Sequence, residues 1–527
     1  MRQQLLNPLR RHQISFLLAA ILLLAAGLRL YALRFSLPAA FNPDEDLLVM
    51  PAMNILKTGD FTPLRMDYGT FFIYLLVPLY AALFLLQMRD GLIGSVDELR
   101  LYEHGAFPAI FPHPEYVLVA RLLVVAFSVG AVLIVFMLAR RLGNERQGLL
   151  AALLAAVMPD LVLHTHFATT DIPLSFMAVL SLYLIVRVYD DWERDSLWAY
   201  AGAGFVCGLA ASTKYNGALL LLPLGLLPLL KARSLDDLIS ARTLAGPLGM
   251  AAGFVAGTPY ALLDLPAFVH AFGSNLRIYN RPGYDPTGST LGWWLEYLFT
   301  HRNAPAVWLG AAGAVISLFR WGRRGWLIHI FVAAYLFTIF GQSERQQRSW
   351  LAIAPLVAVY GGLALDTAWV WWRRRMADNR RWRVAAPAAV LALVLVLLLL
   401  RAAEANRALA TTDVRTNAQQ WIEANIPPGT PLAVDRFPPN ISPEVWPMTQ
   451  VFGLYMQDLA WYQAQGIRYL VIGDIIHDAY RLSDEDWQRY TELTGQLCLV
   501  TEVEGSWVAA PDRRIWIYEV PPCSDPA

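Results

Sequence analysis

Three consecutive acidic residues, Asp44, Glu45 and Asp46, follow shortly after the first long apolar segment of the chain. Like-charge repulsion raises the pKa of a carboxyl group, which suits it to accept a proton from an attacking hydroxyl or amine. The spacing therefore predicts a general base in this stretch. The alternative is a solvated acidic loop near a membrane surface, in which the acids pair with Arg34 or Lys57.

A further acid, Asp171, stands where a later apolar segment begins. Ionisable residues at membrane depth are costly and are usually functional. Asp171 is also well placed to cap a helix with Pro173 in its first turn, and the two roles are compatible. His164 and His166 precede it, but residues at i and i+2 do not share a helical face, so a histidine metal pair is not expected.

Four cations stand out by their positions. Lys214 lies between two apolar stretches, Arg121 lies just inside a predicted span, and Arg345 and Arg348 stand in an unusually polar loop against the positive-inside trend. Guanidinium and ammonium groups suit phosphate oxygens, and arginine offers a fork of donors. We predict that these residues bind the phosphate of a lipid-carried substrate. The alternatives are snorkelling of the lysine to water and ion pairing of each arginine with a neighbouring glutamate.

The loop that ends near Tyr297 is rich in glycine, proline and aromatic residues, among them Tyr284 and Trp293. This composition suits a mobile lid whose aromatic rings stack on a sugar. The alternative for the tryptophans is a belt at the membrane interface. We expect His166, Tyr284 and Trp293 to contact the acceptor or the sugar.

Hydrophobic residues make up 56% of the chain and charged residues only 16%, with a mean hydropathy of +0.41. Soluble globular chains average about 25% charged residues, so this composition predicts a polytopic membrane protein. The formal net charge is zero, which argues against nucleic acid as a partner. The first apolar run has basic residues before it and no small-residue cleavage site after it, as expected of a retained signal anchor. The three cysteines have no metal-binding spacing, and whether Cys498 and Cys523 form a disulfide is left open.

Lysine and arginine collect at the N-terminus and in four connectors, residues 140–146, 231–233, 320–324 and 373–383. Cytoplasmic loops carry this positive excess, which predicts a cytoplasmic N-terminus and an extracytoplasmic C-terminus. We predict about 11 membrane-spanning helices, over residues 14–33, 117–139, 148–165, 171–189, 196–212, 215–231, 244–262, 303–320, 325–341, 349–371 and 383–401.

Residues 70–88 are also long and apolar enough to cross a bilayer, but a crossing here places Asp44 and Asp171 on opposite sides. Pro78 interrupts the segment, and backbone that leaves helical geometry at membrane depth must be buried in protein. We therefore predict an interfacial or re-entrant helix within a large first outer loop, residues 34–116. An ordinary additional span is the alternative.

Residues 404–527 are polar, with alternating helix-like and strand-like patterns. A helix is expected from Thr412, and strands are expected near residues 431–435, 467–473, 496–503 and 514–520. The predicted fold is a polytopic α-helical membrane domain, residues 1–403, followed by a small extracytoplasmic α/β domain, residues 404–527. The membrane domain has a second large outer loop at residues 263–302.

These features, in this order and on one face of the membrane, resemble the integral-membrane glycosyltransferases of GT-C fold. The resemblance covers about residues 14–400 and is greatest to the family 39-like branch, which includes protein O-mannosyltransferases and aminoarabinose transferases. It is carried by Asn42–Glu45, Gly59–Pro63, Arg121, His166–Pro173, Thr213–Gly217 and Gly257–Asp264.

The resemblance implies transfer of a sugar, hexosyl or pentosyl, from a polyprenyl-phosphate donor to a lipid, glycan or protein acceptor at the extracytoplasmic face. Asp44 would be the base with Glu45 beside it, and Asp171 would orient the acceptor or the base. Lys214, with Arg345 and Arg348, would neutralise the leaving phosphate. The chain departs from the family at two places. It has His113-Pro-Glu before the second span, where relatives often show His-Pro-Pro, and the arginine-tyrosine motif expected before the tenth span appears only as Arg345-Gln-Gln-Arg348-Ser-Trp.

The sequence thus predicts a multi-pass enzyme of the cell membrane that works by single-displacement, inverting transfer. No cofactor is required, and a divalent metal is possible but not indicated. A lipid or solute transporter is the main alternative, although no paired halves with interrupted helices are evident. A non-catalytic scaffold whose outer domain binds a partner is the third interpretation.

Overall fold

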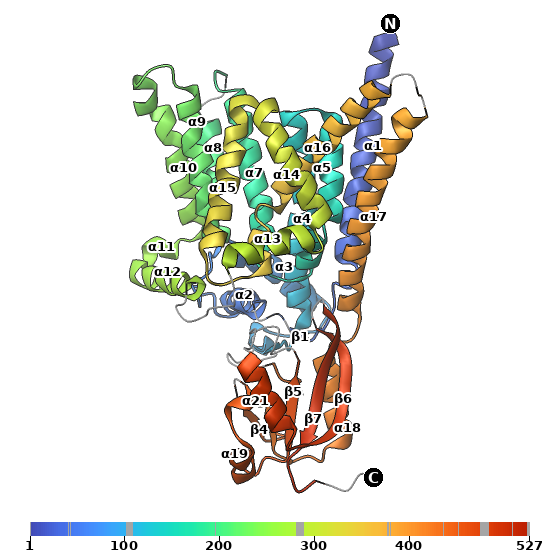
Figure 1. Ribbon diagram of the computed structural model, residues 1–527. Helices are drawn as coiled ribbons and strands as arrows, with labels where there is room; N and C mark the ends of the chain where they lie inside the picture. The colour runs from blue at the N-terminus through green and yellow to red at the C-terminus, as the bar shows by residue number, and fades with distance from the viewer. Residues whose placement is uncertain are drawn as a thin grey trace. The chain divides into compact units, whose positions relative to one another are not determined.

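The computed structural model describes residues 2–523 except 41, 43, 102–108, 195–196, 281–288, 377–378, 380, 436, 452, 475–483 and 508–509. The chain divides into two compact units (Figure 1). The helical unit comprises Met1–Leu33, Leu47–Leu99 and Tyr116–Ala403, and the sheet unit comprises Arg34–Asp46, Arg100–Glu115 and Glu404–Ala527.

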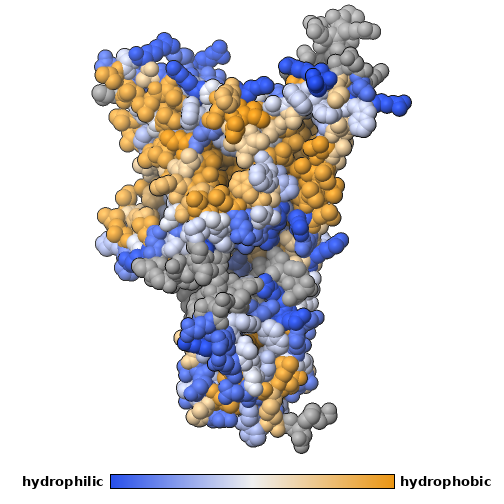
Figure 2. All heavy atoms as spheres, in the orientation of Figure 1, coloured by the Kyte–Doolittle hydropathy of each residue, from blue (hydrophilic) through white to orange (hydrophobic). Residues whose placement is uncertain are grey.

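The helical unit is a bundle of apolar helices whose hydrophobic side chains form a broad band bounded by hydrophilic residues (Figure 2). Its helices are α1 (Arg2–Leu30), α2 (Asp46–Thr58), α3 (Phe71–Arg89), α4 (Pro114–Leu142), α5 (Glu145–Val157), α6 (Pro159–Leu163), α7 (Asp171–Asp190), α8 (Leu197–Thr213), α9 (Leu221–Lys231), α10 (Ala241–Gly257), α11 (Tyr260–Leu263), α12 (Leu265–Tyr279), α13 (Thr290–Thr300), α14 (Ala304–Arg320), α15 (Trp326–Gly341), α16 (Ala354–Arg375) and α17 (Trp382–Ala410). Short 3-10 helices include η2 (His164–His166), η3 (Tyr215–Leu220) and η6 (Gln347–Trp350).

Each of the predicted spans overlaps a helix or a pair of consecutive helices, so the predicted polytopic helical fold is confirmed. Among the described residues, 7 helices are long and apolar enough to cross a membrane, or 8 if the bent pair α5 and Pro159–His166 is one span. The other predicted spans fall on shorter helices or on the more polar α16. The predicted number of crossings therefore stays a prediction.

The helix α3 runs without a break from Phe71 to Arg89 and contains Pro78 in its interior. We expected Pro78 to interrupt this segment, and that expectation is wrong. Proline removes one backbone donor, and an apolar helix can tolerate this loss when the remaining hydrogen bonds hold. Because α3 has the length and composition of a span, its re-entrant placement remains a prediction.

The helices α8 and α10 pack through glycines, and this contact fixes the helix that leads to Lys214. Side chains added at Gly204 and Gly208 of α8 would collide with the backbone of α10, and those added at Gly249 and Gly253 would collide with the backbone of α8. Small residues four apart let two helices approach closely in an apolar environment. The end of α8 is thereby held rigidly where the chain turns at Lys214.

The C-terminal part of the sheet unit is a five-stranded mixed sheet of order β4-β3-β5-β7-β6, with β4-β3-β5 parallel and β5-β7-β6 antiparallel. The strands are β3 (Leu432–Val434), β4 (Met448–Gln450), β5 (Tyr469–Gly473), β6 (Cys498–Trp507) and β7 (Ala510–Glu519); the helices are α18 (Val414–Asn425), α19 (Leu459–Ala464) and α21 (Asp484–Thr494). The predicted small α/β fold and its four predicted strands are confirmed. The same unit contains a short antiparallel pair, β1 (Ala39–Ala40) and β2 (Ala109–Ile110).

The sheet separates two hydrophobic cores because alternate strand residues point to opposite faces. Leu432 and Val434 pack on one face with Val414 and Ile422 of α18. Ala433 between them belongs to the core on the other face, which is closed by α19 and α21. The strand pattern of the sequence and the observed packing therefore agree.

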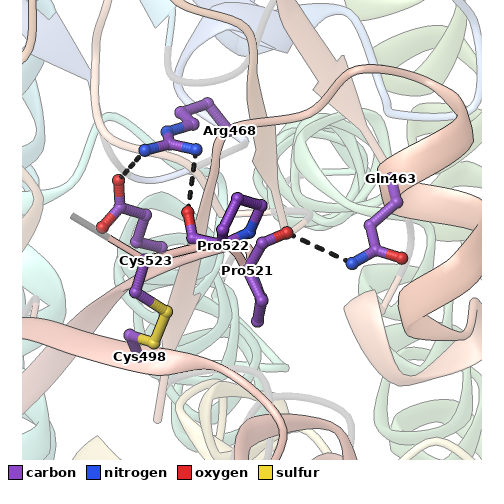
Figure 3. The surroundings of a disulfide bond; sticks show 7 residues. Gln463, Arg468, Cys498, Pro521, Pro522 and Cys523 are labelled. Atoms are coloured by element: carbon purple, nitrogen blue, oxygen red, sulfur yellow. Dashed lines mark hydrogen bonds and ion pairs between the residues drawn. A yellow bond between two sulfur atoms is a disulfide. The ribbon is translucent and has the colours of Figure 1, made fainter.

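A disulfide joins Cys498 at the start of β6 to Cys523 beyond β7 (Figure 3), with a Cα–Cα distance of 6.2 Å. The tail it anchors is also held by Arg468, which donates to the Pro522 carbonyl at 3.1 Å, and by Gln463, which donates to the Pro521 carbonyl at 3.2 Å. The question that the sequence left open is answered in favour of a bridge. Disulfides persist in oxidising compartments.

A buried acid of the C-terminal domain gives a test of the stability of this domain that is independent of catalysis. Asp435 follows β3, and its Oδ1 accepts hydrogen bonds from the Tyr490 hydroxyl at 2.7 Å and the Leu454 amide at 2.9 Å. Burial raises the pKa of Asp435 from 3.8 to about 7. A raised folded-state pKa contributes stability that is present below the unfolded pKa and is lost as the pH rises through the folded pKa.

The domain is therefore expected to lose about 4 kcal/mol of stability between pH 4 and pH 8, whereas Asp435→Asn loses almost none of it over that range. The asparagine oxygen still accepts both hydrogen bonds. Thermal unfolding of the full chain in detergent across this range measures the difference. Asp458→Asn, at the exposed cap of α19, is the control and should follow the wild-type profile. Parallel pH profiles for wild type and Asp435→Asn would contradict the expectation.

Candidate active site

Three of the predicted site residues meet at one end of the helical unit. Asp171 begins α7, and Lys214 lies where α8 ends and η3 begins. The Lys214 ammonium donates to Asp171 Oδ1 at 2.7 Å, and Arg348 Nε of η6 lies 3.9 Å from Asp171 Oδ2. The side chains of Asp171 and Lys214 are only 5% and 11% exposed. Asp171, Lys214 and Arg348 thus form one largely buried cluster, which we call the Asp171 cluster.

The Asp171 cluster favours a bound anion. Burial by itself lowers the pKa of Lys214, but the neighbouring Asp171 carboxylate outweighs this effect, so the pKa lies above its ordinary value. Lys214 is therefore a permanent cation at neutral pH. One carboxylate between two cations leaves a charge of about +1 on these three side chains, in surroundings where charges are poorly screened. A phosphate oxygen fits this charge.

The other two predicted cations have main-chain or hydroxyl partners. Arg345 Nε donates to Thr290 Oγ1 of α13 at 3.4 Å. Arg121 of α4 is fully buried and donates to the Leu33 carbonyl at 2.9 Å, just beyond α1. These bonds tie α13 to the segment before η6, and α4 to the end of α1. Phosphate contacts of Arg345 and Arg121 stay predictions.

His166 is fully buried, with Nε2 2.8 Å from the Tyr31 carbonyl and Nδ1 3.0 Å from the Val162 carbonyl. The ring thus packs the end of α1 against α6. Trp293 of α13 stacks on Tyr297 with a ring-centroid distance of 5.3 Å and an interplanar angle of 2°. Tyr284 lies outside the described residues. Contacts of these three residues with acceptor or sugar stay predictions.

The predicted base lies in a short turn of the sheet unit. The Asp44 amide donates to Asn42 Oδ1 at 3.0 Å, and the Glu45 amide donates to the Asn42 carbonyl at 3.1 Å. Asp44 is half-buried and Glu45 is fully buried. Asp46 begins α2, where the positive end of the helix dipole favours a carboxylate. The residue Asn42 therefore orders the backbone that carries both acids.

One group of residues in the helical unit was missed at the level of sequence. Asp160 of α6 is buried and accepts hydrogen bonds from Tyr297 and Trp350, and it faces Arg302. A signal was available, since Asp160 is an acid inside a predicted span, as Asp171 is.

In the described part of the chain, no three His, Cys, Asp or Glu side chains are placed together as metal ligands.

The basic connectors gather at the opposite end of α7. Arg141 pairs with Asp190 at 2.8 Å and with Asp191 at 2.6 Å, and Arg324 lies 3.5 Å from Asp190. The 20 residues of α7 span about 30 Å. One helix therefore carries the Asp171 cluster at its start and the basic network at its end.

Comparisons with known proteins agree with this architecture. Residues 106–254, which include Arg121, Asp171 and Lys214, match the family described as dolichyl-phosphate-mannose-protein mannosyltransferase. Among solved structures, ArnT from Cupriavidus metallidurans bound to undecaprenyl phosphate is 16% identical with a TM-score of 0.54, covering 98% of this chain and 99% of its own. The archaeal oligosaccharyltransferase AglB from Archaeoglobus fulgidus, in complex with an inhibitory peptide and a dolichol-phosphate, is 14% identical with a TM-score of 0.52, covering 89% of this chain and 70% of its own. No curated protein sequence matches the chain.

The fold is that of the GT-C class of membrane glycosyltransferases, and the chain is a multi-pass membrane protein. Over residues 106–254 it is similar to the family of dolichyl-phosphate-mannose-protein mannosyltransferases, and in fold it is similar to ArnT. The resemblance noted in the sequence is confirmed at the level of the fold. Its donor, its acceptor and the roles of its residues are matters of proposal.

Proposed function

We propose that the protein transfers a sugar from a polyprenyl-phosphate donor to an acceptor at the extracytoplasmic face of the cell membrane. The observation that carries this proposal is the Asp171 cluster, in which a buried carboxylate holds a lysine and an arginine at one end of the bundle. Two proteins of the same fold have been solved with a polyprenyl or dolichol phosphate bound. A lipid phosphate is the anion that the cluster suits best in a membrane setting.

The proposed orientation follows from charge and chemistry. The Arg141 network occupies the end of α7 opposite to Asp171, and the cytoplasmic side of a membrane protein carries the positive excess. The disulfide between Cys498 and Cys523 fits an oxidising compartment for the C-terminal domain. Both observations favour an extracytoplasmic site and an extracytoplasmic C-terminal domain.

The proposed reaction is a single displacement with inversion at the anomeric carbon. The acceptor hydroxyl or amine forms the new bond to the anomeric carbon and gives its proton to Asp44, the role that the resemblance implies. The bond between the anomeric carbon and the phosphate oxygen breaks, and its electron pair leaves with the polyprenyl phosphate. Lys214 and Arg348 stabilise the charge that develops on the phosphate, and Asp171 keeps both cations in place.

Transfer assays test the proposal directly. Full-length protein in native membranes or proteoliposomes is given a panel of radiolabelled polyprenyl-phosphate sugars, with lipid, glycan and peptide acceptors. The expected result is transfer of label to an acceptor from at least one donor, with release of polyprenyl phosphate as the second product. Movement of the intact labelled lipid across the bilayer without cleavage of the sugar–phosphate bond would instead support the transporter.

A further inference from the structure

A second buried carboxylate, Asp160, joins several segments at the same end of the helical unit. Its Oδ2 accepts hydrogen bonds from the Tyr297 hydroxyl at 2.6 Å and from Trp350 Nε1 at 2.9 Å. Its Oδ1 lies 3.5 Å from Arg302 Nε and accepts no hydrogen bond from the described residues. The Asp160 amide donates to Asn303 Oδ1 at 3.2 Å, so the loop before α14 is held from two sides.

The partners of Asp160 connect it to the Asp171 cluster. Trp350 lies two residues after Arg348 in η6, so Asp160 fixes the element that carries this arginine. The residue directly after this element is held from α7, where the Ser175 hydroxyl donates to the Leu351 carbonyl at 2.7 Å. Two buried carboxylates therefore act on one short segment, Asp171 through Arg348 and Asp160 through Trp350.

Arg302 belongs to the same electrostatic neighbourhood. His164, one turn after Asp160, interacts electrostatically with Asp160 and Asp171 and with both Arg302 and Arg348. The Arg302 side chain is 27% exposed, compared with 20% for Arg348 and 1% for Asp160. Arg302 thus has an accessible guanidinium held at its base by a buried acid, which is the arrangement of Arg348 beside Asp171.

A buried carboxylate is costly unless several donors satisfy it, and well-packed apolar residues can replace such groups without loss of stability. Fold stability is therefore a weak reason for Asp160 to be an acid. An acid is needed, however, to hold a cation in a fixed geometry in apolar surroundings. The chemistry of the position points to its arginine neighbours.

We propose that Arg302 is a further cation that binds the phosphate of the lipid donor, and that Asp160 is a positioning residue for Arg302 and for the η6 segment. This inference rests on the proposed function, because it extends the phosphate site of that function. The donor phosphate is then bound by cations from three separate segments, with Lys214, Arg348 and Arg302 each beside a buried carboxylate.

Binding of a polyprenyl phosphate to the full-length protein in detergent tests the inference without an acceptor or a known sugar. Arg302→Gln and Asp160→Asn are each expected to bind about tenfold more weakly than wild type, a change that corresponds to one lost charged contact. The asparagine oxygen can still accept from Trp350 and Tyr297, so both substitutions remove the same interaction, that between Asp160 and Arg302. The double variant should therefore lose little more than either single variant. A purely structural role of Asp160 would instead lower the melting temperature and leave the affinity of the folded protein unchanged.

Asp366→Asn is the matched control. Asp366 of α16 is also buried and pairs with Arg146 and Asn144 at the start of α5. Those residues lie about 20 Å along α5 from the break before Asp160. This control should bind the lipid as wild type does.

The outcomes are distinguishable. Wild-type affinity in Arg302→Gln overturns the inference and leaves the proposed function intact, and this variant decides the question even if Asp160→Asn does not fold. Additive losses in the double variant overturn the positioning role of Asp160. Failure of wild type itself to bind any polyprenyl phosphate overturns the proposed function together with the inference.

Discussion

Replacement of Lys214 by methionine is expected to reduce sugar transfer by about two to three orders of magnitude. The ammonium lies beside the carboxylate of Asp171, with Arg348 on the other carboxylate oxygen. The negative charge of the leaving phosphate grows in the transition state, so a fixed cation in poorly screened surroundings stabilises the transition state more than the bound donor. Initial rates of transfer measure the loss.

Methionine at this position also removes the closer of the two cationic partners of the buried Asp171, and loss of such a partner costs about 3–5 kcal/mol of stability. The double variant Lys214→Met/Asp171→Asn separates the two effects, because it replaces the buried ion pair with a neutral pair. We expect the melting temperature to recover in the double variant and the transfer rate to stay low. Recovery of the rate together with the melting temperature would show that Lys214 acts only through folding.

The architecture followed from local patterns in the sequence. Runs of apolar residues long enough to cross a bilayer predicted the helices, and alternating residues near 467–473 and 514–520 predicted the central strands β5 and β7. The faces that each element buries determine where its apolar residues recur, and this periodicity can be read directly from the sequence. The interruption of the helix at Pro78 was wrongly expected, because the local rule for proline ignores the tolerance of an apolar helix.

The site depended on contacts that no local pattern records. Asp171 and Lys214 are 43 residues apart in sequence. The predicted topology placed both at the same end of the bundle but did not predict that they are in contact. Their 2.7 Å contact follows from the packing of α7 against α8. Asp160 carried the same signal of an acid in an apolar span, but its partners Tyr297 and Trp350 lie 137 and 190 residues further on. Such partners are set by tertiary packing alone.

Asp44→Asn is expected to lower the transfer rate by about 10²–10⁴-fold, the usual contribution of a general base. Asparagine retains the size of the side chain, and the bond from the backbone amide of residue 44 to Asn42 Oδ1, which orders the turn, is kept in the variant. Donor binding should therefore remain near wild type, in contrast to Lys214→Met, which loses both binding and rate.

The neighbouring acid Asp46 supplies the control, since it lies at the start of α2 and has no proposed role in proton transfer. Asp46→Asn should keep the transfer rate within about twofold of wild type, because the half-buried carboxylate at this helix start contributes only about 1 kcal/mol or less to the stability of the helix. Full transfer by a folded Asp44→Asn protein would exclude Asp44 as the base and direct attention to Glu45, which is buried in the same turn.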